Sequence, residues 1–265
     1  MTYILLYLGV GGIAGVLAGL LGIGGGLVIV PMLTFIFTAQ GIDHGLLLHM
    51  ALGTSLASIL FTSVSSMRSH HKRGAVAWNV LAKITPGILV GTFGGSWIAS
   101  MLSTNFLKGF FGVFLIYVAT QMLMGIKPKP NREIPGTFGI FFAGNIIGVF
   151  SSLVGIGGGT LSVPFLVWCN TKIHKAIGTS AAIGLPIAVA GTIGYVVNGL
   201  NVHGLPPFCL GFVNLKALAG IVAASVLTAP IGVRLAHSLS IDKLKRIFAI
   251  LLYVVGAKML GSILF

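Results

Sequence analysis

Apolar residues form long runs along this chain, separated by short clusters of glycine, proline and charged residues. A helix needs about 20 apolar residues to cross a bilayer, and many of the runs reach that length. With the clusters as boundaries, the pattern predicts eight hydrophobic elements, two of them interrupted by glycines: 3–39 (interrupted), 49–67, 75–100, 106–125, 137–170 (interrupted), 176–197, 213–236 and 245–265. We therefore expect an all-α polytopic membrane protein.

Composition supports this fold class. Of the 265 residues, 56% are hydrophobic and 7% are charged, and the mean hydropathy is +1.06, whereas a soluble domain has about 25% charged residues. A soluble domain of this size could not bury so much apolar surface. The first element has no basic segment before it and continues directly into more apolar sequence. We therefore expect it to belong to the mature fold and not to be a signal peptide.

Basic residues are concentrated in four connections between the elements: RSHHKRG (68–74), KPKPNRE (127–133), TKIHK (171–175) and IDKLKR (241–246). In the connections around 40–48, 101–108 and 198–212, Lys108 is the only lysine or arginine. Because positively charged loops remain on the cytoplasmic side, we expect the first group in the cytoplasm and the second outside. The net charge of +13 is thus explained by membrane orientation, and nucleic acid is not an expected partner.

This charge pattern conflicts with a single membrane crossing by residues 137–170. The connections on both sides of this element are basic, so both of its ends are expected on the same side. The element is therefore predicted to enter and return as a hairpin that breaks at its glycines; the alternative is one tilted, unwound span. The same reasoning predicts a hairpin for residues 3–39 and an external N-terminus.

The two halves of the chain repeat each other in three blocks. GIGGGLVIVP (22–31) matches GIGGGTLSVP (155–164), HMALGTS (49–55) matches HKAIGTS (174–180), and residues 103–123 match 240–260. We predict two inverted repeats, each a broken helix or hairpin plus three transmembrane helices. The N-terminal repeat would cover 1–125 and the C-terminal repeat 137–265, joined by a cytoplasmic linker at 126–136. Inverted repeats with matching broken helices are typical of secondary transporters.

The glycine stretches are the first candidate site. GIGGG is not preceded by the strand of a dinucleotide-binding unit. A helix that restarts after an unwound glycine segment presents unpaired N–H groups with partial positive charge, which bind anions. The alternative is close helix packing through small residues, but two copies at predicted breaks favour a binding site. The predicted substrate-binding residues are Gly24, Gly25, Gly26, Gly157, Gly158, Gly159 and Thr160.

The second candidate feature is the pair of GTS motifs, each near the start of the helix that follows a hairpin. Hydroxyl groups can donate to an oxyanion without placing a charge in the membrane. We therefore add Thr54, Ser55, Thr179 and Ser180 to the predicted substrate-binding residues. The alternative is hydrogen bonding between helices. A polar stripe that faces protein or water is also predicted in the element 49–67, formed by Ser55, Ser58, Thr62 and Ser66.

The acidic residues restrict the kind of substrate. Asp43, Glu133 and Asp242 are the 3 acidic residues, and all lie in or beside connections. No carboxylate is predicted inside a span, so a cation pathway or a carboxylate proton relay is not expected.

Basic residues and histidines near the span ends are weaker candidates. Lys83 and Lys216 occupy matching positions and are possible vestibule charges that attract anions, although snorkelling to an interface is the alternative. His49 and His174 also match and are possible proton-coupling groups, because histidine titrates near neutrality. An interfacial histidine without a coupling role is the alternative.

Catalytic and metal-binding patterns are not found in the sequence. It contains no HExxH motif, no paired carboxylates and no Ser/His/Asp set, so we expect no enzyme, no metal and no cofactor. Cys169 and Cys209 are predicted to lie near opposite faces of the membrane and not to pair.

The duplicated GxGGGxxxxP, each copy followed by GTS, resembles the sulfite exporter TauE/SafE family of membrane transporters. The resemblance covers essentially the whole chain, although extra residues at 39–47 make the halves unequal. Members are associated with sulfite, sulfoacetate, sulfonates and thiosulfate. The resemblance implies a secondary transporter of such oxyanions in the cytoplasmic membrane of a bacterium or archaeon. The residues alone imply only a small anion, and an anion channel or a non-transporting scaffold remain alternatives.

Overall fold

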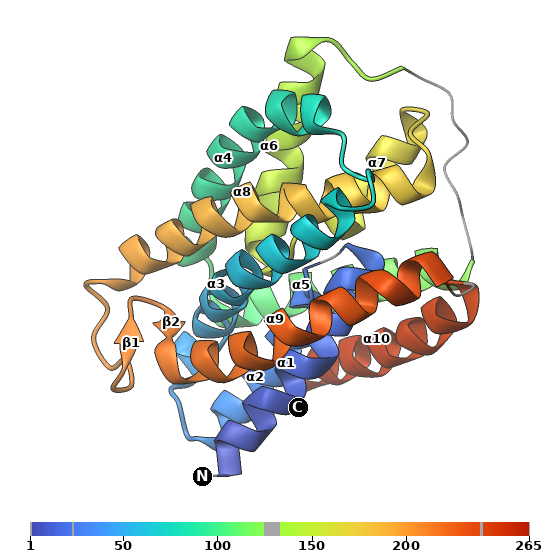
Figure 1. Ribbon diagram of the computed structural model, residues 1–265. Coiled ribbons are helices and arrows are strands. Elements are labelled where there is room, and N and C mark those ends of the chain that lie inside the picture. Colours follow the sequence, from blue (N-terminus) through green and yellow to red (C-terminus); the bar gives the residue numbers. More distant parts are fainter. Residues whose placement is uncertain (1, 23, 125–132, 239–240, 265) are drawn as a thin grey trace.

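The computed structural model describes residues 2–22, 24–124, 133–238 and 241–264 (Figure 1). Most of the predicted linker 126–136 lies outside the described residues. The described elements are α1 (Thr2–Leu21), α2 (Gly26–Ala39), α3 (His44–His71), α4 (Trp78–Met101), α5 (Thr104–Leu123), α6 (Thr137–Val154), α7 (Gly159–Trp168), α8 (Ile173–Gly199), β1 (Cys209–Leu210), β2 (Val213–Asn214), α9 (Leu215–Ser238) and α10 (Ile241–Leu264). Each predicted hydrophobic element is found as a helix, or as two helices where glycines interrupt it.

The predicted all-α polytopic fold is confirmed. Within the described residues, six helices are long and apolar enough to cross a membrane, namely α1, α3, α5, α6, α8 and α9. Large apolar side chains are also exposed along the outer helices, as a lipid-facing surface requires. The central helix α3 is far more buried than these, because it is enclosed by other helices.

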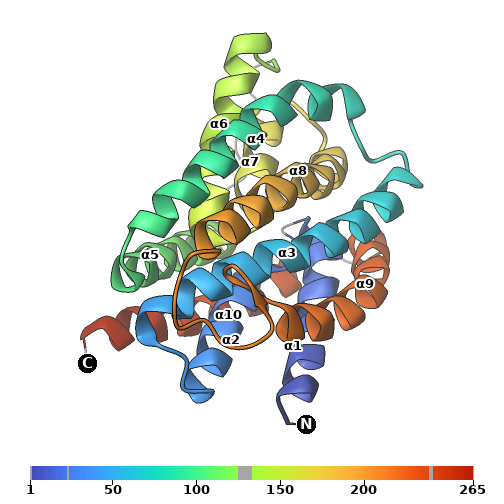
Figure 2. The ribbon, with the colours of Figure 1, turned by 90° about the vertical axis from the view of Figure 1, so that its left-hand side faces the viewer.

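Helices α3 and α8 cross the middle of the molecule side by side (Figures 1 and 2). They run antiparallel, because Leu56 of α3 contacts Gly191 of α8 while Ser63 contacts Gly184. On one flank α1 packs against α9, and on the other α6 packs against α4. Helices α5 and α10 also pack together. If each helix is replaced by its counterpart in the other half, the pairs α1–α9 and α4–α6 exchange places, and the pairs α3–α8 and α5–α10 are unchanged.

Small residues allow the flanking helices to approach closely. Gly11, Gly15 and Gly19 of α1 lie against the backbone of α9 at successively later positions, so these two helices run parallel. Gly87, Gly91 and Gly95 of α4 lie against α6 in the same way. Without a Cβ at these positions the backbones can meet, which is how membrane helices gain contact area in the absence of a hydrophobic force between them.

Helices α1 and α2 form a hairpin that returns to the end of the molecule where it begins. Tyr3 Oη donates to the Ala39 carbonyl at 3.4 Å, and Gln40 Nε2 donates to Tyr7 Oη at 2.8 Å. These bonds join the start of α1 to the end of α2. The predicted return at the first glycine stretch is therefore found.

The segment α6–α7 also forms a hairpin, and this hairpin begins and ends at the opposite end of the molecule. Helix α6 runs parallel to α4, so its first residue lies at the end where α4 begins. Helix α8, which follows α7, begins at this same end, because the Ala77 N–H beside the start of α4 bonds to Thr179. The hairpin interpretation of 137–170 thus holds, and the single tilted span is wrong. That the halves form an inverted repeat across a membrane stays a prediction.

The two ends of the molecule carry different connections. We call them the Phe212 end and the Ala75 end, after a residue in each. The Phe212 end gathers the poorly charged connections, and there Lys108 Nζ donates to His44 Nε2 at 3.0 Å and the Phe212 ring stacks on His49. The basic connections at 68–74 and 171–175 lie at the Ala75 end, beside the Ala77–Thr179 bond.

The sequence did not predict the two short strands. Strands β1 and β2 pair antiparallel across a tight turn at Gly211 and Phe212, within a region expected to be a plain connection and the first residues of a span. Gly211 has a φ of +52°, which suits glycine in such a turn. Within the described residues, Cys169 and Cys209 do not form a disulfide with each other.

Candidate functional site

The glycine stretches break two membrane helices. Helix α1 ends before Gly22, and Gly22, Gly24 and Gly25 have φ values of +69°, +72° and +81°. In the second half Gly155 ends α6 with a φ of +65°. Side-chain-bearing residues rarely adopt this left-handed conformation, so glycine is needed where the chain turns back. We call residues 22, 24 and 25 the first break and residues 155–158 the second break.

The two breaks lie directly against each other. A Cβ on Gly24 would lie 3.1 Å from Gly157 Cα, and a Cβ on Gly26 would overlap the Gly155 carbonyl oxygen. The absence of a side chain at both positions is therefore what permits contact between the halves. The expectation that the breaks face each other agrees with this geometry, whereas ligand binding by their glycines stays a prediction.

The helices that restart after the breaks are uncapped. The N-cap residues are Gly25 for α2 and Gly158 for α7, and neither has a side chain that could accept a hydrogen bond from the first N–H groups of its helix. An uncapped helix start presents unsatisfied N–H groups and a partial positive charge of about one half. The start of α2, at Gly26, contacts Gly155 and Ile156 in the second break, which precedes α7.

Few negative groups could balance this positive character. Asp43 and Glu133 are both exposed, and the side chain of Asp242 lies outside the described residues. Thr160, in the first turn of α7, is buried, and its hydroxyl has no hydrogen-bond partner in the described structure. This hydroxyl and the N–H groups at the start of α7 are donors of the kind that bind anions, and anion binding by them stays a prediction.

The serines of the GTS motifs join each half to the break of the other half. Ser55 Oγ donates to the Gly155 carbonyl at 2.7 Å, and Ser180 Oγ donates to the Gly22 carbonyl at 3.4 Å. These carbonyls end α6 and α1, where no further turn of helix supplies an N–H. In this structure the Ser55 hydrogen therefore satisfies a break carbonyl, whereas the Ser180 hydroxyl also lies 3.0 Å from Ser162 Oγ, with which it forms a second hydrogen bond. Donation to a substrate by Ser55 and Ser180 stays a prediction.

The threonines of the motifs hold the starts of two other helices. Thr54 Oγ1 accepts the Asn214 N–H at 3.0 Å just before α9, and Thr179 Oγ1 accepts the Ala77 N–H at 2.9 Å just before α4. Each threonine oxygen accepts in these bonds, so its own O–H can still donate. Donation to substrate by Thr54 and Thr179 likewise stays a prediction.

The glycines of the GTS motifs let two connecting segments approach. A Cβ on Gly53 would lie 3.0 Å from the Phe212 carbonyl, and a Cβ on Gly178 would overlap the Ala75 carbonyl. Each GTS thus contributes one close approach, one bond to a helix start and one bond to a break. The two copies do so at opposite ends of the molecule.

We expect Ser55→Ala to lower the thermal stability of the detergent-solubilised protein more than Ser180→Ala. Ser55 makes the shorter bond, 2.7 Å against 3.4 Å, and its loss leaves a buried carbonyl without a partner, at a cost of about 1–3 kcal/mol. Thermal unfolding of the two variants measures this difference. Equal stabilities would show that the Gly155 carbonyl gains nothing from Ser55.

The lysines predicted for a vestibule are not brought to the breaks. Lys83 and Lys216 are both exposed, on helix faces that also expose large apolar side chains. Lys216 Nζ lies 4.1 Å from the centre of the Phe208 ring. Such positions suit snorkelling to an interface, and the vestibule role stays a prediction without support from these contacts.

The two matching histidines have different surroundings. His174 is exposed near the start of α8. His49 is buried at the Phe212 end, with Nδ1 3.2 Å from the Gly45 carbonyl and Nε2 3.1 Å from the Ala99 carbonyl. Neutral imidazole can donate to only one of these oxygens, whereas the protonated ring can donate to both. Proton coupling by either histidine stays a prediction.

Sequence reasoning missed the groups that the GTS motifs contact. Phe212 and Asn214 belong to the unpredicted hairpin, and Ala75 and Ala77 have no distinctive side chain. The repeat contains a usable signal, because extending its third block backwards pairs 75–77 with 212–214, a register in which Lys83 matches Gly220 and not Lys216. This alignment marks the two segments as equivalent on the basis of sequence alone.

Comparison with known proteins identifies relatives over the whole fold. The family model described as "Sulfite exporter TauE/SafE" matches residues 7–259. A probable membrane transporter protein of Haemophilus influenzae is 37% identical over 97% of this chain and 98% of its own length. One from Methanocaldococcus jannaschii is 30% identical over 95% of this chain and 93% of its own. No solved structure matches the chain. With matches of this extent, the chain belongs to the sulfite exporter TauE/SafE family of membrane transporters.

Proposed function

We propose that this protein is a secondary transporter of small sulfur-containing oxyanions such as sulfite, an organosulfonate or thiosulfate. The observation that carries the proposal is the contact between the two breaks, each of which is followed by an uncapped helix start. An oxyanion between them would accept hydrogen bonds from backbone N–H groups and complement both helix dipoles. The family name supports sulfite or a related anion as the substrate.

The paired closures at the two ends favour alternating access. At the Phe212 end, Thr54 bonds to Asn214 and Gly53 contacts Phe212. At the Ala75 end the corresponding bonds involve Thr179, Ala77 and Ala75. Opening one closure while the other stays intact would expose the breaks to one side only. Two halves that act as an inverted repeat would make these motions nearly symmetric.

The charge distribution fits a cytoplasmic membrane of a bacterium or archaeon. Basic connections at the Ala75 end support a cytoplasmic location for that end, because positively charged loops remain on the cytoplasmic side. The named relatives come from both groups of organisms and are described as transporters and not as enzymes. Membrane lipid is then the surrounding partner, and the oxyanion is the substrate.

Transport is tested with the purified protein in proteoliposomes loaded with radiolabelled sulfite, thiosulfate or methanesulfonate. We expect saturable flux that accelerates when unlabelled anion is present on the opposite side, because a carrier returns faster when loaded. An ohmic conductance without this acceleration would identify the alternative, an anion channel. If protein shown to be folded carries none of these anions, the proposal is wrong.

A further inference from the structure

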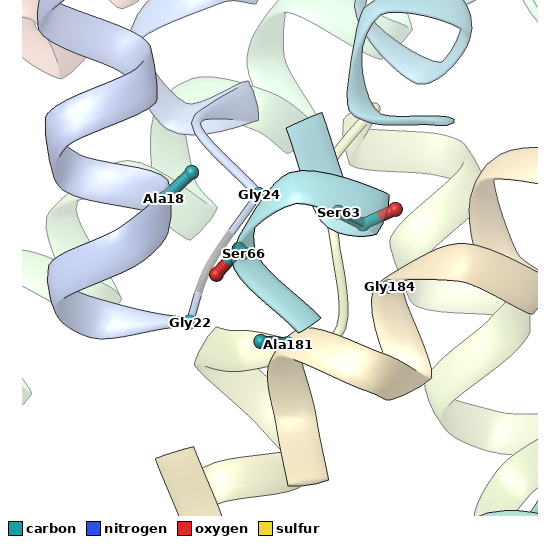
Figure 3. Close-up of a pocket in the computed structure, with 7 residues that line it drawn as sticks. All are labelled: Ala18, Gly22, Gly24, Ser63, Ser66, Ala181 and Gly184. Carbon is teal, nitrogen blue, oxygen red and sulfur yellow. The ribbon is translucent and has the colours of Figure 1, made fainter. Parts of the chain in front are cut away.

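A narrow hollow lies beside the first break, on the side of the Ala75 end (Figure 3). Ala18, Gly22 and Gly24 form one wall, Ser66 of α3 faces them, and Ala181 and Gly184 of α8 close it. The gaps between the atoms of these walls, open solvent included, add up to about 180 Å³, but no single gap is wide enough for a water-sized sphere. Its walls consist almost entirely of small side chains and backbone.

Ser66 differs from the other members of the polar stripe on α3. Ser55 bonds to Gly155, Ser58 to the Thr54 carbonyl, and Thr62 to the Ser58 carbonyl and Ser225. Ser66 is 1% exposed, and its hydroxyl has no hydrogen-bond partner in the described structure. An unpaired buried hydroxyl destabilises the folded state by about 1–3 kcal/mol, so a ligand is a physical reason for its presence.

The Ser66 hydroxyl is directed into the hollow. In Figure 3 its oxygen points toward the chain at Gly22, whereas the Ser63 oxygen points away from the first break. Ser63 Oγ also has a partner, the Leu60 carbonyl of its own helix at 3.2 Å. Ser66 is therefore the side-chain donor that faces the first break from α3.

The repeat places residues of different size at the positions that match the α8 wall. By the repeat, Ala181 and Gly184 correspond to Leu56 and Ile59 of α3. A Cβ on Gly191 of α8 would meet Leu56 Cδ1 at 2.7 Å, and one on Gly24 would meet Ile59 Cγ2 at 3.1 Å, so Ile59 itself lies beside the first break. Small residues thus line the hollow from α8, whereas the matching positions of α3 carry large side chains.

We propose that Ser66 is an oxyanion-binding residue in the substrate pathway between the first break and the Ala75 end. This inference rests on the proposed function. Small walls allow the hollow to widen with a small separation of α3 and α8. The anion then accepts from the Ser66 hydroxyl and from the N–H groups at the start of α2.

Charge at the same end supports this route. Arg68, Lys72 and Arg73 are exposed just beyond Ser66 along α3 and its following turn, and they raise the local concentration of anions. His70, one turn after Ser66, has Nε2 3.1 Å from the Gly19 carbonyl and so holds the last turn of α1 beside the hollow.

The test compares Ser66→Ala with Ser151→Ala in the purified full-length protein. Ser151 is an equally buried serine without a hydrogen-bond partner in the described structure, but it lies in α6, near the second break. Binding of sulfite, thiosulfate and methanesulfonate is measured by calorimetry. We expect Ser66→Ala to weaken binding about tenfold or more, the effect of losing a hydrogen bond to a charged group. Ser151→Ala should bind as the unsubstituted protein does.

Thermal unfolding without ligand separates binding from folding. Because each substitution removes an unpaired buried hydroxyl, neither variant should be less stable than the original protein. If Ser66→Ala binds these anions unchanged, the role of Ser66 is wrong while the proposed function stands. If Ser151→Ala weakens binding equally, the specific role of Ser66 beside the first break is wrong. If the unsubstituted protein binds none of them, both proposals are overturned.

Discussion

Gly26→Ala is expected to lower the free energy of unfolding by about 3 kcal/mol or more and to abolish oxyanion flux. The added Cβ would overlap the Gly155 carbonyl oxygen and lie 2.8 Å from Ile156 Cα. Both are backbone atoms that cannot rotate away, so the two breaks must separate. For a chain of this length the loss corresponds to a fall in Tm of roughly 6–12 °C, measurable by thermal unfolding in detergent.

Gly9→Ala is the matched control for this substitution. Gly9 is an exposed glycine in α1, and a Cβ there would meet no atom within 4 Å. Alanine is the better helix former by about 1 kcal/mol, so this variant should be at least as stable as the original protein. A Gly26→Ala protein with unchanged Tm and flux would show that close contact between the breaks is not needed.

Much of the fold could be predicted because hydropathy and loop charge act on whole segments. A run of apolar residues specifies a membrane helix whatever its neighbours are. Two basic connections flanking 137–170 were enough to predict its return, which the parallel packing of α4 and α6 and the Ala77–Thr179 bond now support. The glycines marked the two helix breaks because few other residues tolerate the left-handed backbone found there.

The partners of individual side chains could not be predicted in the same way. A serine in an apolar helix can donate to any nearby oxygen, and the sequence does not reveal that the oxygen nearest Ser55 belongs to Gly155, in the other half. The strands at 209–214 were missed because they are only two residues each and because pairing, not periodicity, defines them. Contacts of this kind depend on where the chain returns in space.

The polar stripe on α3 shows the same limit within one motif. Its spacing correctly indicated a face directed toward protein, since Ser55, Ser58 and Thr62 are all buried and bonded. The spacing could not distinguish Ser66, whose difference arises from the small residues Ala181 and Gly184 on a helix more than a hundred positions away.

Phe212→Ala is expected to destabilise the protein by about 3–5 kcal/mol, the usual cost of removing a buried aromatic ring. Phe212 is 4% exposed, and its ring lies 5.3 Å from the centre of the His49 ring and 6.4 Å from that of Tyr195. Its backbone N–H also donates to the Tyr195 carbonyl at 3.2 Å. The ring therefore fills the space between α3 and α8 at the Phe212 end.

Phe208→Ala tests whether burial, and not simply loss of an aromatic residue from this hairpin, causes the effect. Phe208 is 63% exposed and contacts Lys216 through a cation–π interaction, which is worth about 0.5–1 kcal/mol at an exposed site. Its loss should lower stability by no more than this amount, as measured by thermal unfolding under the same conditions.

If the hairpin tip closes one side of the transport pathway, Phe212→Ala should also raise unstimulated efflux of oxyanion from proteoliposomes. Folded Phe212→Ala protein with unchanged efflux would place the closure elsewhere, and equal instability of the two variants would contradict the packing role of the Phe212 ring.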